Sequence, residues 1–315
     1  MKITSIGELI VDFTPAGKSN GDNPLYEMNC GGACANVAAA AAKLGAEAVF
    51  AGKVGKDVFG EFLVQRLTES GVNTEYMIAD DRYDTTLAFV HLNDMGDRSF
   101  HFVRNPGAET RLVFNDIPKA MLEDTDILHF GSIPLTHEPS RSTIMQIAKK
   151  AYDAGKIVSF DPNLRRPLWN DLYEAREVLL SCLRFSHILK VSEKELEFLT
   201  GISTLKKATE YLSDKYGLQM ILVTLGKDGV YCKHGEETYS LPAFEKIQPI
   251  DTTGAGDCFI GAFLRCVSEY GMGAMYGETL KNVLRFANIA AGLSTAGKGT
   301  IASFPDETTV KGFLD

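Results

Sequence analysis

The sequence lacks the features of a membrane, secreted or nucleic-acid-binding protein. No apolar run approaches the ~18 residues that a transmembrane helix needs, and Glu8 and Asp12 interrupt the apolar N-terminus where a signal peptide would carry its hydrophobic core. The 32 Lys and Arg residues are scattered and are outnumbered by 41 Asp and Glu, which gives a net charge of −9. Nucleic acid and anionic membranes are therefore not expected partners, and we expect a cytoplasmic protein that binds a small ligand.

Cysteine is also scarce, with six residues among 315 and no C-x-x-C pair. This usage does not fit a disulfide framework and is typical of reduced thiols in a reducing compartment. Cys30 and Cys34 form a C-x-x-x-C, but no His or Cys pair lies nearby in the sequence to complete a zinc site. Neither a disulfide-stabilised fold nor a zinc centre is predicted.

What the sequence does contain is an alternation of short apolar strands with amphipathic helices. Strands are predicted at 3–9, 48–54, 127–130, 156–160, 188–191 and 220–224, and helices at about 35–44, 57–70, 140–154 and 280–295. This alternation predicts an α/β fold. With 45% hydrophobic and 23% charged residues, the composition is that of a globular protein, and we expect one domain spanning residues 1–315.

Two strand-like segments break this alternation. Residues 85–92 and 99–104 are joined by N-D-M-G-D, which is a hairpin signal, and no helix separates them. They therefore do not belong to a parallel βαβ layer. We expect residues 84–104, together with the loop at 12–28, to form a small lid sheet over a ligand site.

The most informative stretch runs from Ile250 to Leu264 and reads I-D-T-T-G-A-G-D-C-F-I-G-A-F-L. The small residues Gly254, Ala255 and Gly256 allow backbone N–H groups to surround one point at the start of a predicted helix, where the helix dipole also favours an anion. Asp257 would lie beside that anion. The residues alone leave two interpretations open: a phosphate site with an adjacent base, or an ordinary acid or cap in the first helical turn.

Two motifs resemble the signatures of the ribokinase-like (PfkB) sugar kinase family. The run D-T-T-G-A-G-D-x-x-x-G-A from Asp251 to Ala262 is similar to the C-terminal signature, and C-G-G-A-C-A-N-V-A from Cys30 to Ala38 is similar to the N-terminal glycine-pair signature. Cys34 stands where fructokinases usually carry Pro. The resemblance covers nearly all of the chain. It implies a three-layer α/β/α fold with a mostly parallel central sheet, ATP and Mg²⁺ as cofactors, and a homodimer paired through the lid.

The resemblance also implies roles for individual residues. Asp257 would be the catalytic base, and the anion hole would be formed with it by Gly254, Ala255 and Gly256. The implied sugar-binding residues are Asp12, Gly31, Gly32, Asn36, Arg104, Asn163 and Arg165. The implied nucleotide-binding residues are Lys190, Ser192, Glu193, Thr224, Gly226, Gly229 and Asn288, with Glu193 also reaching Mg²⁺ through water. A K⁺ site is implied at Asp251, Thr253, Ser294, Gly299 and Ser303.

For several of these residues a structural interpretation stays open. By position alone, Asp12 is a solvated loop acid and Arg104 is a surface residue at a strand end. Ser192 and Glu195 have capping-box spacing, which explains both residues without a ligand. On the same grounds Glu193 is a solvated acid in the first turn of a helix.

One apparent phosphate motif is set aside. The run G-L-S-T-A-G-K-G at 292–299 nearly spells a P-loop. It follows a predicted helix rather than a strand, and Gly299 replaces the Ser or Thr whose hydroxyl would bind magnesium. No P-loop is therefore predicted.

The runs H-F-G-S-I-P-L, F-V-R-N-P and D-P-N-L-R-R-P-L-W look more like fructokinases than like ribokinase or adenosine kinase. This resemblance implies transfer of a phosphoryl group from ATP to the 6-hydroxyl of D-fructose. Two alternatives stay open: a 2-keto-3-deoxygluconate or aminoimidazole riboside kinase of the same family, and a non-catalytic sugar or nucleotide sensor. A Rossmann dehydrogenase is not expected, because no G-x-G-x-x-G follows the first strand.

Overall fold

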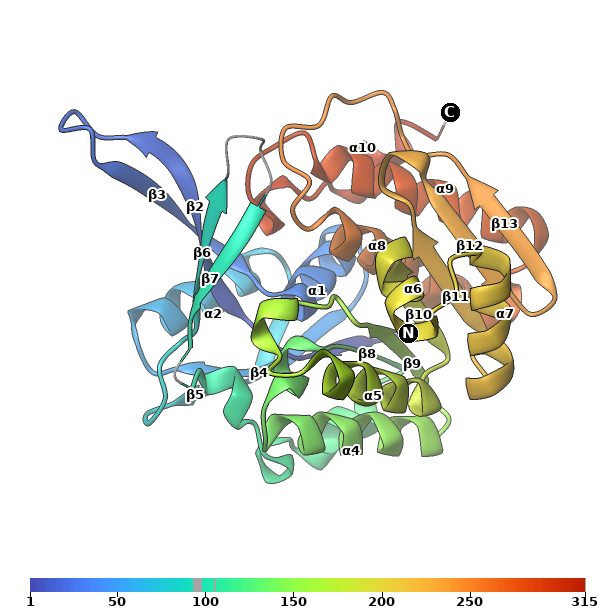
Figure 1. Ribbon diagram of the computed structural model, residues 1–315, viewed down its shortest axis with the longest axis horizontal. Coiled ribbons are helices and arrows are strands. Elements are labelled where there is room, and N and C mark those ends of the chain that lie inside the picture. The colour runs from blue at the N-terminus through green and yellow to red at the C-terminus, as the bar shows by residue number, and fades with distance from the viewer. Residues whose placement is uncertain (93–97, 105, 315) are drawn as a thin grey trace.

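The computed structural model describes residues 1–92, 98–104 and 106–314, which form a large central sheet, a small second sheet and surrounding helices (Figure 1). The central strands are β1 (Ile3–Ile6), β4 (Ala48–Gly55), β5 (Asn73–Asp80), β8 (Ile127–Gly131), β9 (Ile157–Asp161), β10 (Ile188–Ser192), β11 (Met220–Thr224), β12 (Val230–His234) and β13 (Glu237–Leu241). The strands of the second sheet, which we call the lid sheet, are β2 (Ile10–Lys18), β3 (Pro24–Gly31), β6 (Leu87–Leu92) and β7 (Arg98–Val103). The helices are α1 (Ala33–Lys43), α2 (Val58–Glu69), α3 (Lys119–Asp124), α4 (Ser140–Asp153), α5 (Leu172–Cys182), α6 (Glu193–Thr200), α7 (Leu205–Tyr216), α8 (Ala255–Tyr270), α9 (Gly277–Ser294) and α10 (Glu307–Lys311).

The central sheet has nine strands in the order β13-β12-β11-β10-β9-β8-β1-β4-β5. Every neighbouring pair from β11 to β5 is parallel, and β12 and β13 extend one edge in antiparallel pairing. Strand β4 illustrates why the predicted strands are short apolar runs. All eight of its residues are buried, and a strand covered on both faces is almost wholly apolar. The predicted mostly parallel α/β sheet is confirmed.

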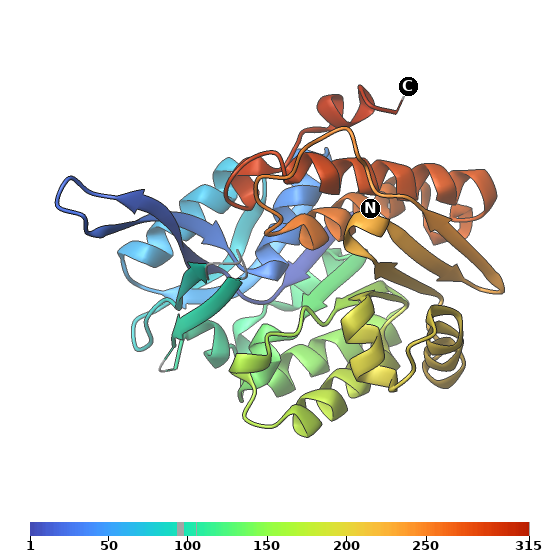
Figure 2. The ribbon, with the colours of Figure 1, turned by 45° about the horizontal axis from the view of Figure 1, so that its top comes forward.

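Helices cover both faces of this sheet and complete three layers. Figure 2 shows the orange and red helices α8 to α10 on one side and the green to yellow helices α4 to α7 on the other. Each layer buries its own apolar cluster, one that includes α1, α8 and α9 and one that includes α4 to α7. The carboxyl ends of the parallel strands therefore lie between two rigid helical layers, which is where ligands bind in open α/β sheets.

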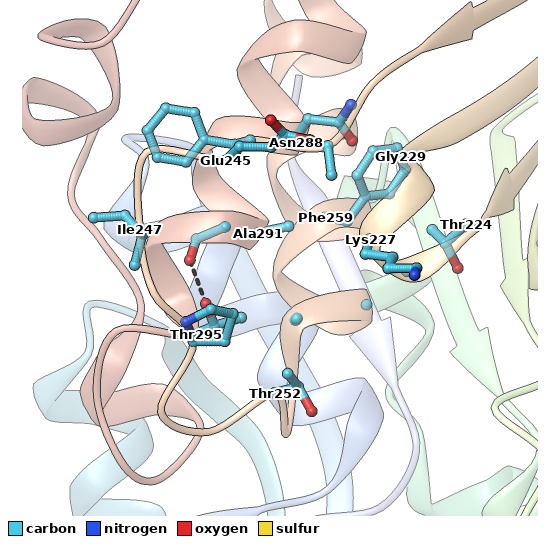
Figure 3. A pocket seen from close by; sticks show the side chains of 17 residues that line it. Thr224, Lys227, Gly229, Glu245, Ile247, Thr252, Phe259, Asn288, Ala291 and Thr295 are labelled. Atoms are coloured by element: carbon cyan, nitrogen blue, oxygen red, sulfur yellow. Dashed lines mark hydrogen bonds between the residues drawn. The ribbon is translucent and has the colours of Figure 1, made fainter.

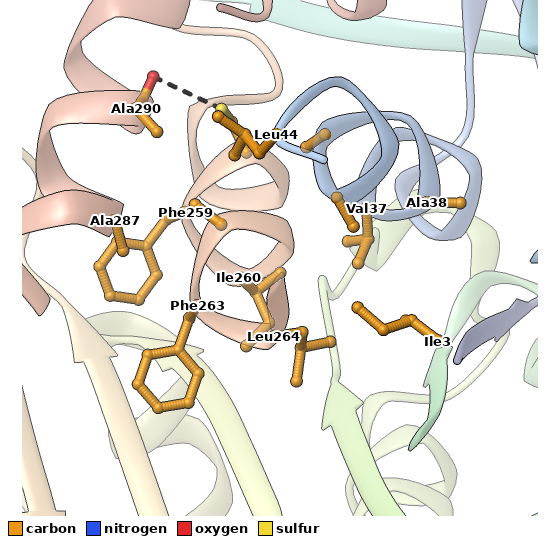
Figure 4. Packing of buried hydrophobic residues seen from close by; sticks show 14 of the residues in the cluster. Ile3, Val37, Ala38, Leu44, Phe259, Ile260, Phe263, Leu264, Ala287 and Ala290 are labelled. Carbon is orange, nitrogen blue, oxygen red and sulfur yellow. Dashed lines mark hydrogen bonds between the residues drawn. The ribbon is translucent and has the colours of Figure 1, made fainter. Parts of the chain in front are cut away.

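Helices α1 and α8 pack unusually closely. The alanines at 38–41 are fully buried, and a Cβ placed on Gly261 would lie 2.7 Å from the Cβ of Ala40. Figure 4 shows Phe259, Ile260, Phe263 and Leu264 of α8 in this packing, with Val37 of α1 nearby. These apolar positions have the helical spacing that the sequence predicted. The close contact matters for function because it brings the N-terminal turns of the two helices together.

The lid sheet has the strand order β3-β2-β6-β7 and projects from the central sheet (Figure 1). Strands β6 and β7 pair antiparallel, as expected for 85–92 and 99–104, while the predicted turn at 93–97 lies outside the described residues. The segment at 12–28, expected as a loop within the lid, is formed by strands β2 and β3. Strand β2 pairs with β6 in parallel, which joins the two halves of the lid sheet.

The first strand is shorter than predicted, and this changes the position of Asp12. Strand β1 ends at Ile6 and is followed by Gly7, where a Cβ would lie 2.3 Å from the Sγ atom of Cys34. The chain then enters the lid sheet at Ile10. Asp12 therefore lies within strand β2 and not in a loop that follows the first strand.

The strand register assigns side chains to the two faces of the lid sheet, since directly paired residues point to the same face. Asp12 pairs with Asn29 and Ala88. Ala88 in turn pairs with Phe102, and the next same-face pair along β6 and β7 contains Phe100. Asp12 and Phe100 therefore share one face, which we call the site face.

Two findings concern the whole described chain. No helix within residues 1–92, 98–104 and 106–314 is long and apolar enough to cross a membrane. All six cysteines are buried and none is paired in a disulfide, as their spacing predicted.

Candidate active site

The glycine-rich turn and Asp257 lie at the N-terminus of α8. Gly254 is the residue before the helix and has a φ of 77°, a left-handed conformation that favours glycine. Ala255, Gly256 and Asp257 form the first helical turn, where backbone N–H groups have no partner within the helix. N–H groups at a helix N-terminus favour an anion, although the N–H of Ala255 also donates to the carbonyl of Thr252 over 3.3 Å.

Two asparagines hold the carboxylate of Asp257. The Nδ2 atom of Asn36 donates to Oδ2 over 2.8 Å, and the Nδ2 atom of Asn163 donates to Oδ1 over 3.1 Å. Asp257 is only 6% exposed. Both carboxylate oxygens are therefore oriented by neutral amides from two distant parts of the chain, a role that an ordinary acidic residue of a first helical turn does not have.

The surroundings of Asp257 raise its proton affinity. Burial raises the pKa of its carboxyl group above the ordinary value, although Lys190, the amide of Asn36 and the Arg165 guanidinium oppose this shift. A buried carboxylate with an elevated pKa is a stronger base than an exposed one, and such groups are frequent at catalytic sites.

Asn163 is held in a turn that directly follows β9. Its φ of 39° is unusual for a residue with a side chain, and such a conformation costs about 1–3 kcal/mol unless the surroundings enforce it. The Oδ1 atom of Asp161 accepts the Asn163 N–H over 3.1 Å, and Oε1 of Glu195 accepts the Leu164 N–H over 2.7 Å. Arg165 Nη1 donates to Asn163 Oδ1 over 2.5 Å. The turn is thus fixed from several sides and directs the Asn163 amide at Asp257.

Lys190 places a buried positive charge beside the same turn of α8. Its Nζ donates to Oδ2 of Asp161 over 2.8 Å, and a Cβ on Gly256 would lie 2.8 Å from that Nζ. Burial alone would lower the pKa of Lys190, but the carboxylates of Asp161, Glu195 and Asp257 together raise it above the ordinary value. Lys190 therefore stays protonated and adds a full positive charge to the partial charges of the helix N-terminus.

Asp12 and the glycine pair lie next to one another on the opposite side of Asp257. A Cβ on Gly31 would lie 2.0 Å from Asp12 Oδ2, so any side chain at Gly31 would displace that carboxylate. Gly32 has a φ of 107° and immediately precedes α1. Burial raises the pKa of Asp12 to about 7 against the influence of Arg165, and the nearby Asp257 and Glu8 raise it as well.

Glu8 is a buried acid whose contacts the sequence did not suggest. Its Oε1 accepts the N–H groups of Ala33 and Cys34 over 2.6 and 3.4 Å, and burial raises its pKa to about 7. These N–H groups belong to the first turn of α1, so Glu8 fixes the helix that carries Asn36. The available signal was a glutamate directly after Gly7 in a run of buried apolar residues.

A cavity of about 560 Å³ lies on the other side of the glycine-rich turn (Figure 3). Figure 3 shows side chains converging on it from the turn after β11, from α8 and from α9. Of the predicted nucleotide residues, Thr224, Gly226, Gly229 and Asn288 line it, and Ala255 and Gly256 do so as well. Its apolar wall is formed by residues that the sequence analysis did not identify, Phe244, Ile247, Phe259 and Ala291. A mostly apolar cleft that ends at an anion site suits a nucleotide.

Ser192 and Glu193 lie at the start of α6 and do not line this cavity. Ser192 and Glu195 form the predicted capping box. Glu193 is exposed in the first turn of the helix. The oxygen atoms of an exposed carboxylate are suitable for a magnesium ion that keeps most of its waters.

Arg104 is buried at the junction between β7 and the central sheet. Its Nε donates to Glu109 Oε1 over 2.6 Å, its Nη1 to Thr136 Oγ1 over 2.9 Å, and its Nη2 to the carbonyl of Ile133 over 3.2 Å. The alternative of a solvent-exposed arginine is therefore wrong. These three hydrogen bonds anchor the lid sheet and are not directed at Asp12 or Asp257.

Four of the five residues of the implied K⁺ site come together. Asp251 Oδ1 accepts the N–H of Thr253 over 2.8 Å, and the N–H of Gly299 lies 3.4 Å from Oδ2. The Ser303 hydroxyl donates to the carbonyl of Gly299 over 2.8 Å. The Ser294 hydroxyl instead donates to the carbonyl of Ala291 within α9. The loop is rich in the oxygen donors that hard cations prefer.

The arrangement defines an α/β phosphotransferase site. The N-terminus of α8, with Lys190 beside Gly256, lies at the nucleotide-sized cavity, which Ala255 and Gly256 line. Asp257, buried and held by two asparagines, follows this turn directly, and its charge also acts on Asp12, which lies beside Gly31. Phosphoryl transfer requires mainly positioning and charge stabilisation, and both are present here.

Comparison with known proteins identifies the family. Residues 1–307 match the family described as pfkB family carbohydrate kinase. Fructokinase-1 of rice (Oryza sativa subsp. japonica) is 39% identical over 312 residues, 98% of this chain and 96% of that protein. Among solved structures, fructokinase from Xylella fastidiosa with bound ATP superposes with a TM-score of 0.91 at 28% identity, covering 99% of this chain and 97% of that one. Fructokinase from Vibrio cholerae O395 with fructose, ADP and calcium gives 0.89 at 31% identity, covering 100% and 99%.

The chain therefore belongs to the pfkB family of carbohydrate kinases, and its architecture is the ribokinase-like α/β fold with a small additional sheet. The resemblance inferred from the two sequence motifs is confirmed.

Proposed function

We propose that this protein is an ATP-dependent kinase that phosphorylates the 6-hydroxyl of D-fructose and produces fructose 6-phosphate. The observation that carries the proposal is the position of Asp257. Its neighbour Gly256 lines the nucleotide cavity, while its own carboxylate is held by Asn36 and Asn163 on the side of Asp12. The names of the most similar curated proteins and the ligands of their solved relatives support the choice of fructose and ATP.

In the proposed reaction, Asp12, the glycine pair and the two asparagines orient the sugar. Among the described residues, the Oδ1 atom of Asn36 is buried and has no hydrogen-bond partner, so it is available to accept a hydrogen bond from a sugar hydroxyl. Asp257 takes the proton of the attacking 6-hydroxyl, a contribution of roughly 10² to 10⁴ in rate for a general base. A hydroxyl held in line with the γ-phosphorus needs little further activation.

The charge that develops on the transferred group is stabilised by the N–H groups of residues 254–257, with the ammonium of Lys190 beside them. Magnesium, when bound, neutralises charge on the β- and γ-phosphates, and Glu193 would hold it through water. Potassium would be held by Asp251, Thr253, Gly299 and Ser303. In both cases the protein supplies the oxygen ligands that the ion prefers.

The proposed lid and dimer rest on the lid sheet. Leu25, Tyr26 and Val103 of this sheet expose 45%, 37% and 49% of their surface, so apolar side chains of the lid sheet are available to a second surface. We propose that two copies of the chain pair through their lid sheets and that each chain is one domain.

The closest alternative acceptor is a sugar acid such as 2-keto-3-deoxygluconate. Its carboxylate would approach the buried acids Glu8 and Asp257 and the half-buried Asp12. Arg165 is the cation that influences the pKa values of both Asp12 and Asp257. Repulsion between like charges that lie close together disfavours binding of an anionic sugar. The site therefore favours a neutral sugar.

A panel of sugars with ATP and Mg²⁺, read by product mass, tests the proposal. We expect a phosphorylated product with fructose at a higher kcat/KM than with 2-keto-3-deoxygluconate or aminoimidazole riboside. A higher kcat/KM for either of these two acceptors would identify that acceptor, and not fructose, as the substrate. Absence of sugar-dependent ADP production with every acceptor would instead favour the sensor.

Gly31→Ala should weaken fructose binding. The new Cβ would lie 2.0 Å from Asp12 Oδ2 and displace that carboxylate, so a charge-assisted hydrogen bond is lost and kcat/KM for fructose falls about 10- to 100-fold. Steady-state kinetics with fructose varied at saturating ATP measure this. Gly273→Ala is the matched control, because nothing lies within 4 Å of its new Cβ. If both variants have the same kcat/KM for fructose, Asp12 does not bind the sugar.

Activity should be lost as the pH falls below about 7. The pKa of Asp12 is raised to about 7 and that of Asp257 is also raised, and both must be ionised to accept hydrogen bonds or a proton. Because a raised carboxyl pKa means protonation at higher pH, kcat/KM for fructose declines through this range on acidification. A profile between about pH 5 and pH 9 measures the effect. A flat profile down to pH 5 would contradict it.

A further inference from the structure

Phe100 brings the lid sheet into contact with the active site. It lies in β7 on the site face, the face that also carries Asp12. The Cζ atom of Arg165 lies 5.6 Å from the centre of the Phe100 ring, within the range of a cation–π contact. Arg165 belongs to the turn after β9, so this contact connects the lid sheet to the central sheet.

Arg165 is itself linked to the base. Its Nη1 donates to Asn163 Oδ1, and the other end of the same amide donates to Asp257. A shift of the guanidinium would therefore pull on the amide that orients the carboxylate. The backbone around Asn163 is fixed by Asp161 and Glu195, so the adjustable parts of this connection are the side chains.

We propose that Phe100 is a positioning residue for phosphoryl transfer: it holds the Arg165 guanidinium in place and so transmits the position of the lid sheet through Asn163 to Asp257. The inference rests on the proposed function. It gives the lid sheet a role beyond covering the sugar, because the base is fully oriented only when β7 carries Phe100 to Arg165.

The charges around Asp257 give the proposal a specific readout. Ionisable groups that influence or are influenced by its carboxylate come from several elements: Asp12 of β2, Cys34 of α1, Asp161 of β9, Arg165 of the following turn, Lys190 of β10, Glu195 of α6 and Cys258 of α8. Asp12 belongs to the lid sheet itself. Among the other groups of this set, and within the described residues, Arg165 alone has a described contact with the lid sheet, namely with Phe100. Arg165 lowers the pKa of both Asp257 and Asp12. Releasing it should therefore raise these pKa values and move the acid limb of the pH profile to higher pH.

Phe100→Leu tests this, because leucine keeps an apolar side chain but removes the aromatic face. We expect kcat with fructose and ATP to fall about 3- to 10-fold with less change in KM for ATP. The acid limb of kcat/KM should move up by a few tenths to one pH unit. The matched control is Phe198→Leu, which removes an arginine contact of similar geometry, 5.5 Å from Arg166. It should not move the acid limb.

A double-mutant cycle with Arg165→Met completes the test. If Phe100 acts through Arg165, Phe100→Leu should have little further effect in the Arg165→Met background, since coupled residues are not additive. An unshifted acid limb in folded Phe100→Leu, a shift of the same size in Phe198→Leu, or full additivity would overturn the inference. If the wild-type protein itself does not phosphorylate fructose, the proposed function fails instead, and the two failures are thereby distinguished.

Discussion

Asp257→Asn is expected to reduce kcat by about 10² to 10⁴ while leaving the KM values for fructose and ATP within a few-fold of wild type. The substitution keeps the size of the side chain but removes its ability to take a proton. The two amides that hold Asp257 cannot both donate to an asparagine, so some loss of stability accompanies the loss of rate. Steady-state kinetics together with thermal unfolding separate the two effects.

Asp214→Asn, at an exposed position of α7, is the control for this experiment. It changes the net charge by the same amount at a distance from the site and should retain wild-type turnover. If Asp257→Asn retains most of its turnover in a folded protein, Asp257 is not the base. A different group near the N-terminus of α8 would then have to accept the proton of the sugar hydroxyl.

Lys190→Met should cause a large loss of stability. Lys190 is 6% exposed and pairs with Asp161 over 2.8 Å. Removing one member of a buried ion pair leaves an uncompensated charge and typically costs about 3–5 kcal/mol. Activity should fall as well, because the charge beside Gly256 that would stabilise the transferred phosphoryl group is lost. Chemical denaturation and kinetics measure both effects.

The double variant Lys190→Met with Asp161→Asn distinguishes these two effects. Neutralising Asp161 should recover part of the stability, since neither partner is then a buried, unpaired ion. It should not recover the rate, because no cation returns to the glycine-rich turn. Lys206→Met, at an exposed ion pair on α7, should change the stability by less than about 1 kcal/mol. Full recovery of turnover in the double variant would show that Lys190 acts only as a structural partner of Asp161.

The sequence predicted the central part of the site because its chemistry is local. Gly254, Gly256 and Asp257 lie within four positions, and the helix that follows has a clear apolar period. The parallel strands other than β5 were predicted for a similar reason, since they are short apolar runs. Strand β5 was not predicted, because it lies at the edge of the sheet and is only partly buried. Strand ends were predicted less accurately, since the first strand stops at Ile6 and not at Leu9.

The remaining features depend on contacts between distant positions. Asn36 and Asp257 are 221 residues apart, and no pattern in either segment shows that their side chains meet. The sequence did not reveal the contacts of Asp161 and Glu8 with the site, because a buried acid and a surface acid look alike in sequence. Arg104 was expected at the sugar, yet its donors are used by Glu109 and its neighbours. The contact of Phe100 with Arg165 likewise exists only once the lid sheet has formed.

The central claim, phosphoryl transfer from ATP to the 6-hydroxyl of D-fructose, is tested most directly by locating the phosphate on the product. Purified protein is incubated with ATP, Mg²⁺ and ¹³C-labelled fructose, and the product is examined by ³¹P and ¹³C NMR, with Asp257→Asn in parallel. The account predicts phosphorus coupling to carbon 6 in the wild-type reaction and almost no product with the variant. Phosphate on carbon 1, or no phosphorylated sugar at all from the wild-type protein, would contradict it.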